Sequence, residues 1–511
     1  MDQLVQFAAI EFHIGEGPLY QQLFDEIVRR IRNGALPAGH RLPPTRVLAK
    51  TVGAHRNTVV RAYEALEDAG FVDSTVGRGT FVAAAPAPQL TPVPDIDAPR
   101  SAGVPWSRLA SRATRVEPLS RWERVAQHIQ TKKEVINLTR MQPCGDLLPT
   151  ALFKRCIDHV LRTMAGRALE YSPREGLPRL REAVCRDLAR QGVACAPDDI
   201  LITTGSQQAL DLVARSLVDP GDAFLVDATT YAGAVTALGA AGAQLIPFPS
   251  DDFGPDPSAI QQLGDTGVKG AYLMPGAHNP TGRRTTATRR AALLRWSRQA
   301  GIPLIEDDYA ADLQLDDIPA PAPLRAADGE VVYIGTYSKK LIPALRVGFV
   351  LAPTALRPHL VALKQTVDLG TSALMQHALA EFLERGYLEP HLERIRPEYR
   401  RRRDALVEGL NDHLPAGFKV RSPAAGHSTW LSLPPGVEPS EVFRAAQDEG
   451  VLVSPSTLFQ VGNRAERGLR LTFCTEPPGR LAEGAVRLAR ALRRLRPTAV
   501  KIAEPDALGV T

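Results

Sequence analysis

The stretch VVYIGTYSKKLIPALRVG, residues 331–348, contains the feature that decides the fold of most of this chain. Its apolar, β-branched start, residues 331–334, predicts a buried strand. Ser338 and Lys339 follow that strand closely, and Arg346 comes seven residues after Lys339. A lysine in this place is unlike the usual solvated lysine. Because a desolvated lysine amine forms Schiff bases with carbonyl groups, Lys339 is the expected reactive residue.

Upstream of this stretch, other strand-like runs also end in polar residues. TTGSQQAL (203–210) and HNPTG (278–282) each follow an apolar run, IEDDY (305–309) completes one, and Tyr231 follows a fourth at 223–227. These runs alternate with amphipathic helical patterns, which predicts an α/β domain with a mostly parallel sheet. Open sheets of this kind place ligands at the carboxyl ends of their strands.

Each strand end offers a group with known chemistry. The helix that begins near Ser206 presents backbone N–H groups and a hydroxyl, which bind phosphate well. The turn at 278–282 presents the amide of Asn279, and the strand before Tyr309 presents the carboxylate of Asp307. Any one of them is also typical of an ordinary turn or a solvated strand end. As a group they indicate a ligand crevice.

The strings TTGSQQAL, HNPTG, IEDDY and YSKKLIPALRVG, in this order, resemble the fold-type I pyridoxal phosphate enzymes, and specifically the aminotransferases. The resemblance runs from about Asn137 to Arg490. It implies that Lys339 carries pyridoxal 5′-phosphate as an internal aldimine and that Asp307 keeps the pyridinium nitrogen protonated, which makes the ring an electron sink. The other cofactor contacts that it implies are Ser206, Gln207, Ser338 and Arg346 at the phosphate, Asn279 and Tyr309 at the ring hydroxyl, and Tyr231 on the ring face.

A further arginine lies near the C-terminal end of the chain. The string GLRLTF, residues 468–473, resembles the aminotransferase strand whose arginine holds the α-carboxylate of the substrate. The resemblance makes Arg470 a candidate ligand-binding residue, and an ordinary surface arginine on a strand is the alternative. Gly233, two residues beyond Tyr231, offers no side chain to hold a second carboxylate.

Residues 15–82 form a separate block with a different pattern. Apolar residues four apart in the run 19–32 predict an amphipathic helix. Thr45 is expected to cap a short helix, and another helix is expected to begin near Arg56. The segment 71–82 predicts two strands joined by a glycine turn. This order of elements is a winged helix-turn-helix, an α+β fold.

The polar residues of this block suit DNA. Its candidate contacts lie at the start of the second short helix, on the helix before it and in the wing: His55, Arg56, Asn57 and Thr58, then Arg46, then Gly77, Arg78 and Gly79. Arginine reads guanine and asparagine reads adenine in the major groove, and residues on the preceding helix reach phosphates. The alternative is a small protein-binding module with solvated faces.

The block also resembles the DNA-binding domain of the GntR superfamily. The matching string is LPPTRVLAKTVGAHRNTVVRAYEALEDAGFVDSTVGRGTFV, residues 42–82. One position departs from the family pattern, because His55 stands where a small hydroxyl residue is usual. The base contact at that position is therefore open.

Length and composition indicate how these two blocks are arranged and which class of protein they belong to. The 511 residues divide into the block 15–82, a proline- and alanine-rich linker at 83–125 and the α/β block 126–497. The net charge of +5 neither requires nor excludes nucleic acid. The five cysteines show no metal-ligand spacing, and there is no secretion signal or membrane span. We expect a cytoplasmic protein without a metal site.

A GntR-type reader joined by such a linker to an aminotransferase-like domain is similar to the MocR subfamily of regulators. The similarity implies a homodimer, in which domains are exchanged in some members, that binds double-stranded operator DNA. We expect a regulator that senses a small amino compound, or pyridoxal phosphate itself, through the aldimine at Lys339. The alternative is an active aminotransferase with an attached DNA-binding module.

Overall fold

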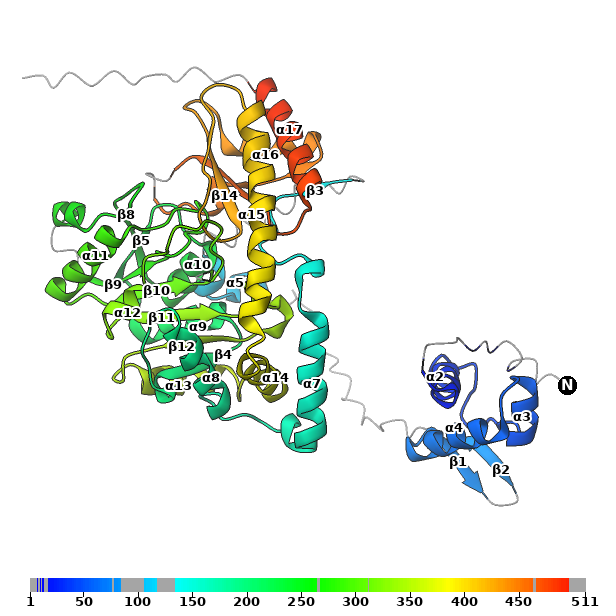
Figure 1. Cartoon of the computed structure of the whole chain (residues 1–511). Coiled ribbons are helices and arrows are strands. Elements are labelled where there is room, and N and C mark those ends of the chain that lie inside the picture. The colour runs from blue at the N-terminus through cyan, green and yellow to red at the C-terminus, as the bar shows by residue number, and fades with distance from the viewer. Residues whose placement is uncertain are drawn as a thin grey trace, which may run out of the picture. The chain divides into compact units, whose positions relative to one another are not determined.

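The computed structural model describes residues 7, 10, 12, 17–75, 78–83, 105–116, 134–263, 267–310, 312–462 and 466–495. The chain divides into two compact units, residues 1–104 and 105–511 (Figure 1). Each unit has its own apolar core, the smaller one around Leu23, Leu48 and Val59. No helix in the described ranges is long and apolar enough to cross a membrane.

The first unit is a winged helix-turn-helix. It contains α2 (Leu19–Arg32), α3 (Thr45–Thr51), α4 (Arg56–Asp68) and the antiparallel strands β1 (Val72–Thr75) and β2 (Gly79–Val82). The apolar face of α4 packs inward, and the hydroxyl of its buried Tyr63 donates a hydrogen bond to the Pro43 carbonyl at 2.8 Å. This bond ties α4 to the turn that precedes α3.

The expected cap of α3 by Thr45 is wrong. Thr45 is already the first residue of the helix, and Pro44 stands at the N-cap with an extended backbone and no side-chain cap. The Pro44 carbonyl accepts from the amides of Val47 (2.8 Å) and Leu48 (3.0 Å), which starts the helix one residue early. The preceding residue therefore sets this helix start through its main chain alone.

The second unit is built on a seven-stranded sheet in the order β4-β12-β11-β10-β9-β5-β6. Only β12 runs antiparallel to its neighbours. The strands are β4 (Ile200–Thr203), β5 (Ala223–Asp227), β6 (Gln244–Phe248), β9 (Val268–Leu273), β10 (Leu304–Asp308), β11 (Val332–Thr336) and β12 (Gly348–Leu351). The predicted, mostly parallel α/β sheet is confirmed.

Helices connect and cover these strands: α7 (Thr150–Met164), α8 (Pro178–Ala189), α9 (Ser206–Leu217), α10 (Ala232–Ala241), α11 (Ala287–Ala300), α12 (Leu324–Ala327), α13 (Arg357–Val367) and α14 (Ala373–Glu384). Buried Glu306 fixes one of these helices, since its carboxylate accepts from the first two amides of α12.

Because six strands of the sheet run in the same direction, their carboxyl ends lie at one edge of the sheet, where the loops that follow them converge.

A smaller subdomain follows. Its antiparallel sheet has the order β13-β14-β17-β16, from β13 (Lys419–Val420), β14 (Ser428–Ser432), β16 (Ser454–Pro455) and β17 (Gly468–Thr472). Three helices belong to it: α15 (Leu388–His413), α16 (Pro439–Asp448) and α17 (Pro478–Arg494). β15 (Val451–Leu452) pairs with β3 (Ile136–Asn137). The long α15 runs alongside both parts (Figure 1) and donates from Arg396 to Asp312 and from Arg402 to Cys474.

Residues 105–116, which the sequence places in the linker, lie in the second unit. They form the short helices α5 (Trp106–Leu109) and η1 (Arg112–Arg115). Val116 packs over Gly239 of α10, where an added Cβ would come within 2.9 Å of its side chain. The folded C-terminal unit thus begins before residue 126, because α10 offers a glycine surface to the arriving chain.

Candidate functional site

The start of α4 presents a row of polar side chains to solvent. His55, Arg56 and Asn57 are exposed and Thr58 is half-buried. Arg46 is exposed on α3. The residues that the sequence selects as base and phosphate contacts therefore lie where a duplex could reach them, while the opposite face of α4 is committed to the core.

His55 takes the place of the usual small hydroxyl residue as the N-cap of α4. Its Nδ1 accepts from the backbone amide of Asn57 at 3.3 Å. A cap of this kind satisfies one of the amides that lack a partner within the helix. The imidazole thus replaces the hydroxyl in its structural role.

We predict that His55→Ala lowers the unfolding free energy of the N-terminal unit by about 1 kcal/mol, the usual effect of losing an N-cap. His55→Ser should retain most of the stability, because a hydroxyl accepts from the same amide. Thermal unfolding of the two variants measures this. Equal loss in both would show that the imidazole does not act as a cap.

The wing carries one cation that the sequence singles out and one that it misses. Arg78 is exposed at the tip, and Gly79 has φ +110°, a conformation that favours glycine. The missed residue is Arg41, whose guanidinium lies 5.9 Å from the centre of the Phe81 ring and fills the space beside Gly79. Gly77 lies outside the described residues.

In the second unit, five parallel strands bring the predicted residues to one edge. Ser206 and Gln207 follow β4, Tyr231 follows β5, and Asn279 follows β9. Asp307 and Tyr309 come from the end of β10. Ser338 and Lys339 come just after β11, and Arg346 directly precedes Val347 and β12.

The pKa values of Lys339 and its neighbour Lys340 are shifted in opposite directions. Burial alone would lower the pKa of Lys340, but its ammonium contacts Asp187 at 3.1 Å and Asp312, which raise that pKa well above its ordinary value. Burial lowers the pKa of Lys339, and its Nζ donates to the Met141 carbonyl. Lys339 is therefore the lysine whose amine more readily loses its proton.

Asp307 is a buried carboxyl group with one oxygen in use. Tyr272 donates to its Oδ2 at 2.7 Å, and its Oδ1 has no hydrogen-bond partner among the described residues. Burial raises the pKa of Asp307 to about 7, against the lowering effect of the Tyr272 hydroxyl. Such a group favours a cationic N–H facing Oδ1, because the cation would stabilise the ionised form.

An anion-binding corner forms where α9 begins. Its first amides, at Ser206 and Gln207, have no partner within the helix. Arg346 reaches this point, with its guanidinium 2.9 Å from the Thr204 carbonyl. Gly205 makes room for it, since an added Cβ there would lie 2.8 Å from the Arg346 Nη2. The hydroxyl of the buried Ser338, which precedes Lys339, has no hydrogen-bond partner among the described residues.

The side chain of Gln207 serves another purpose. Its Nε2 donates to the Gly233 carbonyl at 3.0 Å, and its Oε1 accepts from the Tyr231 hydroxyl at 3.0 Å. The Gln207 side chain therefore orients the Tyr231 ring. Only the backbone amide of Gln207 is left for an anion at the start of α9. Gly233 has a packing reason to lack a side chain, because a Cβ would lie 2.4 Å from Gln207 Oε1.

Arg470 is half-buried, and its guanidinium has no acidic partner in the described parts of the chain. It donates to Asn279 Oδ1 at 3.2 Å and to the Thr139 carbonyl at 3.1 Å, and it lies 4.8 Å from the centre of the Phe459 ring. Burial lowers its pKa to about 10. A half-buried cation that makes only neutral contacts is suited to bind an anion.

Three residues of this region escape sequence reasoning. The Met141 carbonyl contacts Lys339, and Met141 Sδ lies 3.2 Å from an Arg470 nitrogen, although 198 residues separate Met141 from Lys339. Tyr272 orients Asp307. His427 is buried, and neither ring nitrogen has a hydrogen-bond partner in the described ranges; burial lowers its pKa to about 3, with Lys339 adding to the effect. Of these three, only Tyr272 lies in an apolar run that the sequence marks as a strand, β9.

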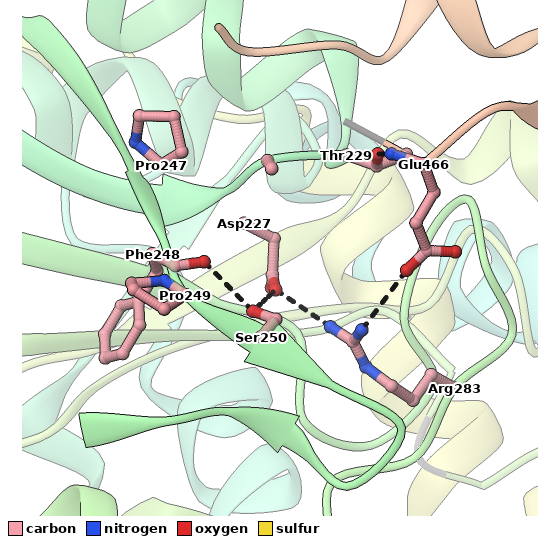
Figure 2. Close-up of a pocket in the computed structure, with 9 residues that line it drawn as sticks. Asp227, Thr229, Pro247, Phe248, Pro249, Ser250, Arg283 and Glu466 are labelled. Atoms are coloured by element: carbon pink, nitrogen blue, oxygen red, sulfur yellow. Dashed lines mark hydrogen bonds and ion pairs between the residues drawn. The ribbon is translucent and has the colours of Figure 1, made fainter. Parts of the chain in front are cut away.

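A buried ion cluster supports the turn that carries Asn279. Figure 2 shows Asp227 between Ser250 (2.6 Å) and Arg283 (2.8 Å), with Glu466 beyond Arg283. These residues line a cavity of about 290 Å³. Burial would raise the pKa of Asp227, yet His278 and Arg283 hold it well below its ordinary value. The Arg283 carbonyl accepts from the His278 amide at 2.8 Å, which closes the turn.

Main-chain hydrogen bonds connect this edge to the small subdomain. The Thr230 amide donates to Phe459 at 2.9 Å, and the Val461 amide donates to Ala228 at 2.8 Å. The segment that presents Tyr231 is thereby joined to the segment that presents Phe459 against Arg470. A ligand held between Tyr231 and Arg470 would contact both of these segments at once.

Two family models match the chain. Residues 133–488 match the aminotransferase class I and II family, and residues 19–82 match the bacterial regulatory proteins of the gntR family. A probable rhizopine catabolism regulatory protein, MocR of Rhizobium meliloti, is 30% identical over 94% of this chain and 94% of its own length. Both units therefore occur together, in the same order, in a relative of nearly equal extent.

The chain belongs to the MocR-type GntR regulators. Its C-terminal unit belongs to the aminotransferase class I and II family. The 2-aminoadipate transaminase of Thermus thermophilus is 34% identical to this MocR-type regulator over 69% of its chain and 89% of the transaminase.

The structure of LysN, an α-aminoadipate aminotransferase of Thermus thermophilus, matches with a TM-score of 0.70 and 32% identity. The match covers 76% of the MocR-type regulator and 99% of LysN, which was solved with N-(5′-phosphopyridoxyl)-L-leucine. The predicted family and fold class of the regulator are confirmed.

Proposed function

We propose that this protein is a pyridoxal phosphate-dependent transcription regulator that senses a carboxylated amino compound. The observation that carries the proposal is Arg470, a half-buried guanidinium without a carboxylate among the described residues, which contacts the same residue, Met141, as the amine of Lys339. The exposed start of α4 on the same chain supplies the DNA reader.

The residues present fit pyridoxal 5′-phosphate. The unpartnered Oδ1 of Asp307 suits the pyridinium N–H, and the start of α9 with Arg346 suits the phosphate. Lys339 would hold the aldehyde, Tyr231 would cover the ring face, and Asn279 and Tyr309 would hold the ring hydroxyl. When bound, this cofactor supplies an aldehyde that binds amines covalently.

In this proposal an amino effector takes the place of Lys339 while its carboxylate binds Arg470. Arg470 contacts Asn279, Thr139 and Met141, so the effector draws together the large sheet, the segment after β3 and the small subdomain. A ligand that binds one arrangement of these parts better than another shifts the population toward it. That shift changes the affinity of the reader for operator DNA.

The deciding experiment is fluorescence anisotropy of the full-length protein on DNA from upstream of its own gene, at fixed salt because the affinity depends on it. It is run without cofactor, with pyridoxal phosphate, and with cofactor plus each of a panel of amino acids. The proposal requires specific binding that shifts with one compound. Binding only at nonspecific strength, whatever is added, would contradict it.

We predict that Arg56→Ala weakens specific operator binding by about 1–3 kcal/mol, as expected when a base contact is lost. Binding to unrelated DNA should fall much less. Arg29→Ala, an exposed arginine on α2 paired with Glu26, is the matched control and should change neither value. Equal losses of affinity for operator and unrelated DNA would show that Arg56 contacts phosphates and not a base.

We predict that Arg470→Met raises the effector concentration for half-maximal response at least about 30-fold, since a buried charged contact is lost. Cofactor loading should stay intact, because no phosphate contact is removed. Each amino acid is compared with the amine that lacks its carboxylate, and that amine should be unaffected. A response that is independent of Arg470 would favour pyridoxal phosphate itself as the effector.

A second candidate function is transamination. The relationship to the Thermus thermophilus transaminase favours it, and so does the presence of the whole predicted cofactor set at one edge. Steady-state assays with amino donors and a 2-oxo acid separate the two functions. Turnover without any operator binding would establish the enzyme.

We also propose that the regulator acts as a homodimer in which two DNA-binding units bind paired half-sites. Apolar side chains that the single chain leaves exposed support this, among them Leu169, Tyr171 and Leu369 of the second unit. Sedimentation at micromolar concentration tests the state. A monomer that binds a single half-site with full affinity would contradict the proposal.

A further inference from the structure

A second polar cavity lies beside β10, on the side of Asp308 rather than Asp307. Successive side chains of a strand point to opposite faces, and Asp308 accepts from Tyr333 of β11, whereas Asp307 accepts from Tyr272 of β9. This cavity of about 300 Å³ is lined by Arg190, Gln191, Gly276, Arg290, Asp308, Gln314 and residues 320–323. It is not part of the crevice around Lys339.

Two acceptor oxygens in this cavity have no hydrogen-bond partner among the described residues. One is Oδ1 of Asp308, whose side chain is only 8% exposed, and the other is Oε1 of Gln191. The amide nitrogen of Gln191 donates to Asp312 at 3.1 Å, which fixes its oxygen on the opposite side. Asp308 and Gln191 line the same cavity, and two buried acceptors without a donor there suit a group with at least two donors.

The two arginines of the cavity differ in their freedom. Arg290 donates to the carbonyls of Thr285, Pro275 and Ala322, at 3.1, 2.7 and 2.8 Å, and is thereby committed. Arg190 is exposed just beyond α8 and forms no ion pair with any residue that the structure describes. The cavity thus offers a carboxylate inside and a free guanidinium outside, a charge pattern that selects a ligand with both signs.

We propose that this cavity binds a small amino-acid zwitterion, with its ammonium group on Asp308 and Gln191 and its carboxylate on Arg190. The site is independent of Lys339 and of the effector crevice. Asp308 adjoins Asp307 in β10, so an occupant would sit directly beside the strand that holds the cofactor.

The test uses calorimetry on the full-length, cofactor-loaded protein with two probes, L-proline and N-methylglycine. Both are zwitterions with two N–H donors, and as secondary amines they do not displace Lys339, so the visible absorbance of the cofactor should stay unchanged. We expect saturable binding. N,N,N-trimethylglycine, with the same charges and no N–H donor, should bind at least about tenfold more weakly, the effect of losing charged hydrogen bonds.

Variants identify the site. Asp308→Asn and Arg190→Ala should each weaken proline binding at least about tenfold. Arg167→Ala, an exposed arginine elsewhere in this unit, should leave it within twofold. Loss of binding in Arg470→Met but not in Arg190→Ala would overturn the proposal by placing the probe in the effector crevice. Failure of both probes to bind at tens of millimolar would also overturn it.

Discussion

Lys339→Ala will lose covalently bound cofactor and every response of DNA affinity to amino compounds. Lys339 is the amine whose pKa burial lowers, whereas its neighbour Lys340 is held protonated between Asp187 and Asp312. Lys340 cannot replace Lys339, because its removal from that pair would leave two buried carboxylates without their cation. The effect should be complete rather than partial.

Two measurements check this result. Borohydride reduction followed by peptide mass spectrometry should find the cofactor on Lys339 in the wild type and on no peptide of the variant. Anisotropy of the variant should show less than a twofold change in DNA affinity when effector is added. Lys339→Arg, which keeps the charge but not the nucleophile, should behave like Lys339→Ala, and the exposed Lys419→Ala should behave like wild type. An unchanged effector response in Lys339→Ala would refute covalent sensing.

Asp307→Asn will stabilise the cofactor-free protein and weaken its hold on the cofactor. The pKa of Asp307 is about 7 in the folded chain against an ordinary value of 3.8. Between these values the unfolded chain releases a proton that the folded chain keeps, so wild-type stability falls as pH rises from about 4 to 7. Above about pH 7 the penalty is constant, on the order of a few kcal/mol.

Asparagine avoids that penalty and still accepts from Tyr272. In thermal unfolding of the cofactor-free protein, the advantage of Asp307→Asn should be largest at pH 8 and vanish near pH 4. With pyridoxal phosphate the order reverses, because only a carboxylate stabilises the pyridinium N–H, and cofactor affinity should drop at least about tenfold.

Asp308→Asn is the matched control for this change. Asp308 adjoins Asp307, is equally buried, and has its pKa raised to about 6 by burial and by Asp312. Its replacement should also stabilise the cofactor-free protein at pH 8, yet leave cofactor affinity unchanged. If both variants lowered the cofactor affinity alike, the effect would come from a disturbance of β10 and not from the loss of a contact to the ring.

The sequence could point to these candidate site residues because most of them sit next to elements that leave a local signal. Asn279 and Lys339 each follow a buried strand within a few positions, Asp307 lies at the end of another, and the parallel sheet brings these strand ends to one edge. The helix starts at Ser206 and Arg56 are equally local. Neighbouring residues along the chain were sufficient to place these groups.

What the sequence could not predict depends on partners that are distant in the chain. The Met141 carbonyl meets Lys339 across 198 positions, and no pattern near either residue marks the contact. The direction of the Gln207 side chain depends on where Tyr231 lies. The start of α3 depended on a carbonyl of Pro44 rather than on the Thr45 hydroxyl. The free guanidinium of Arg190 and its cavity left no signal at all.

The pairing of Lys340 with Asp187 has a consequence for how such proteins diverge. Two adjacent lysines look like a spare copy, yet only one of them is chemically available. A lineage that lost Lys339 would keep its fold, its buried ion pairs and its DNA reader, and it would lose covalent chemistry in one step. Its descendants would be sensors that bind their ligands reversibly and without a bond, and a lysine still present at position 340 would disguise the change.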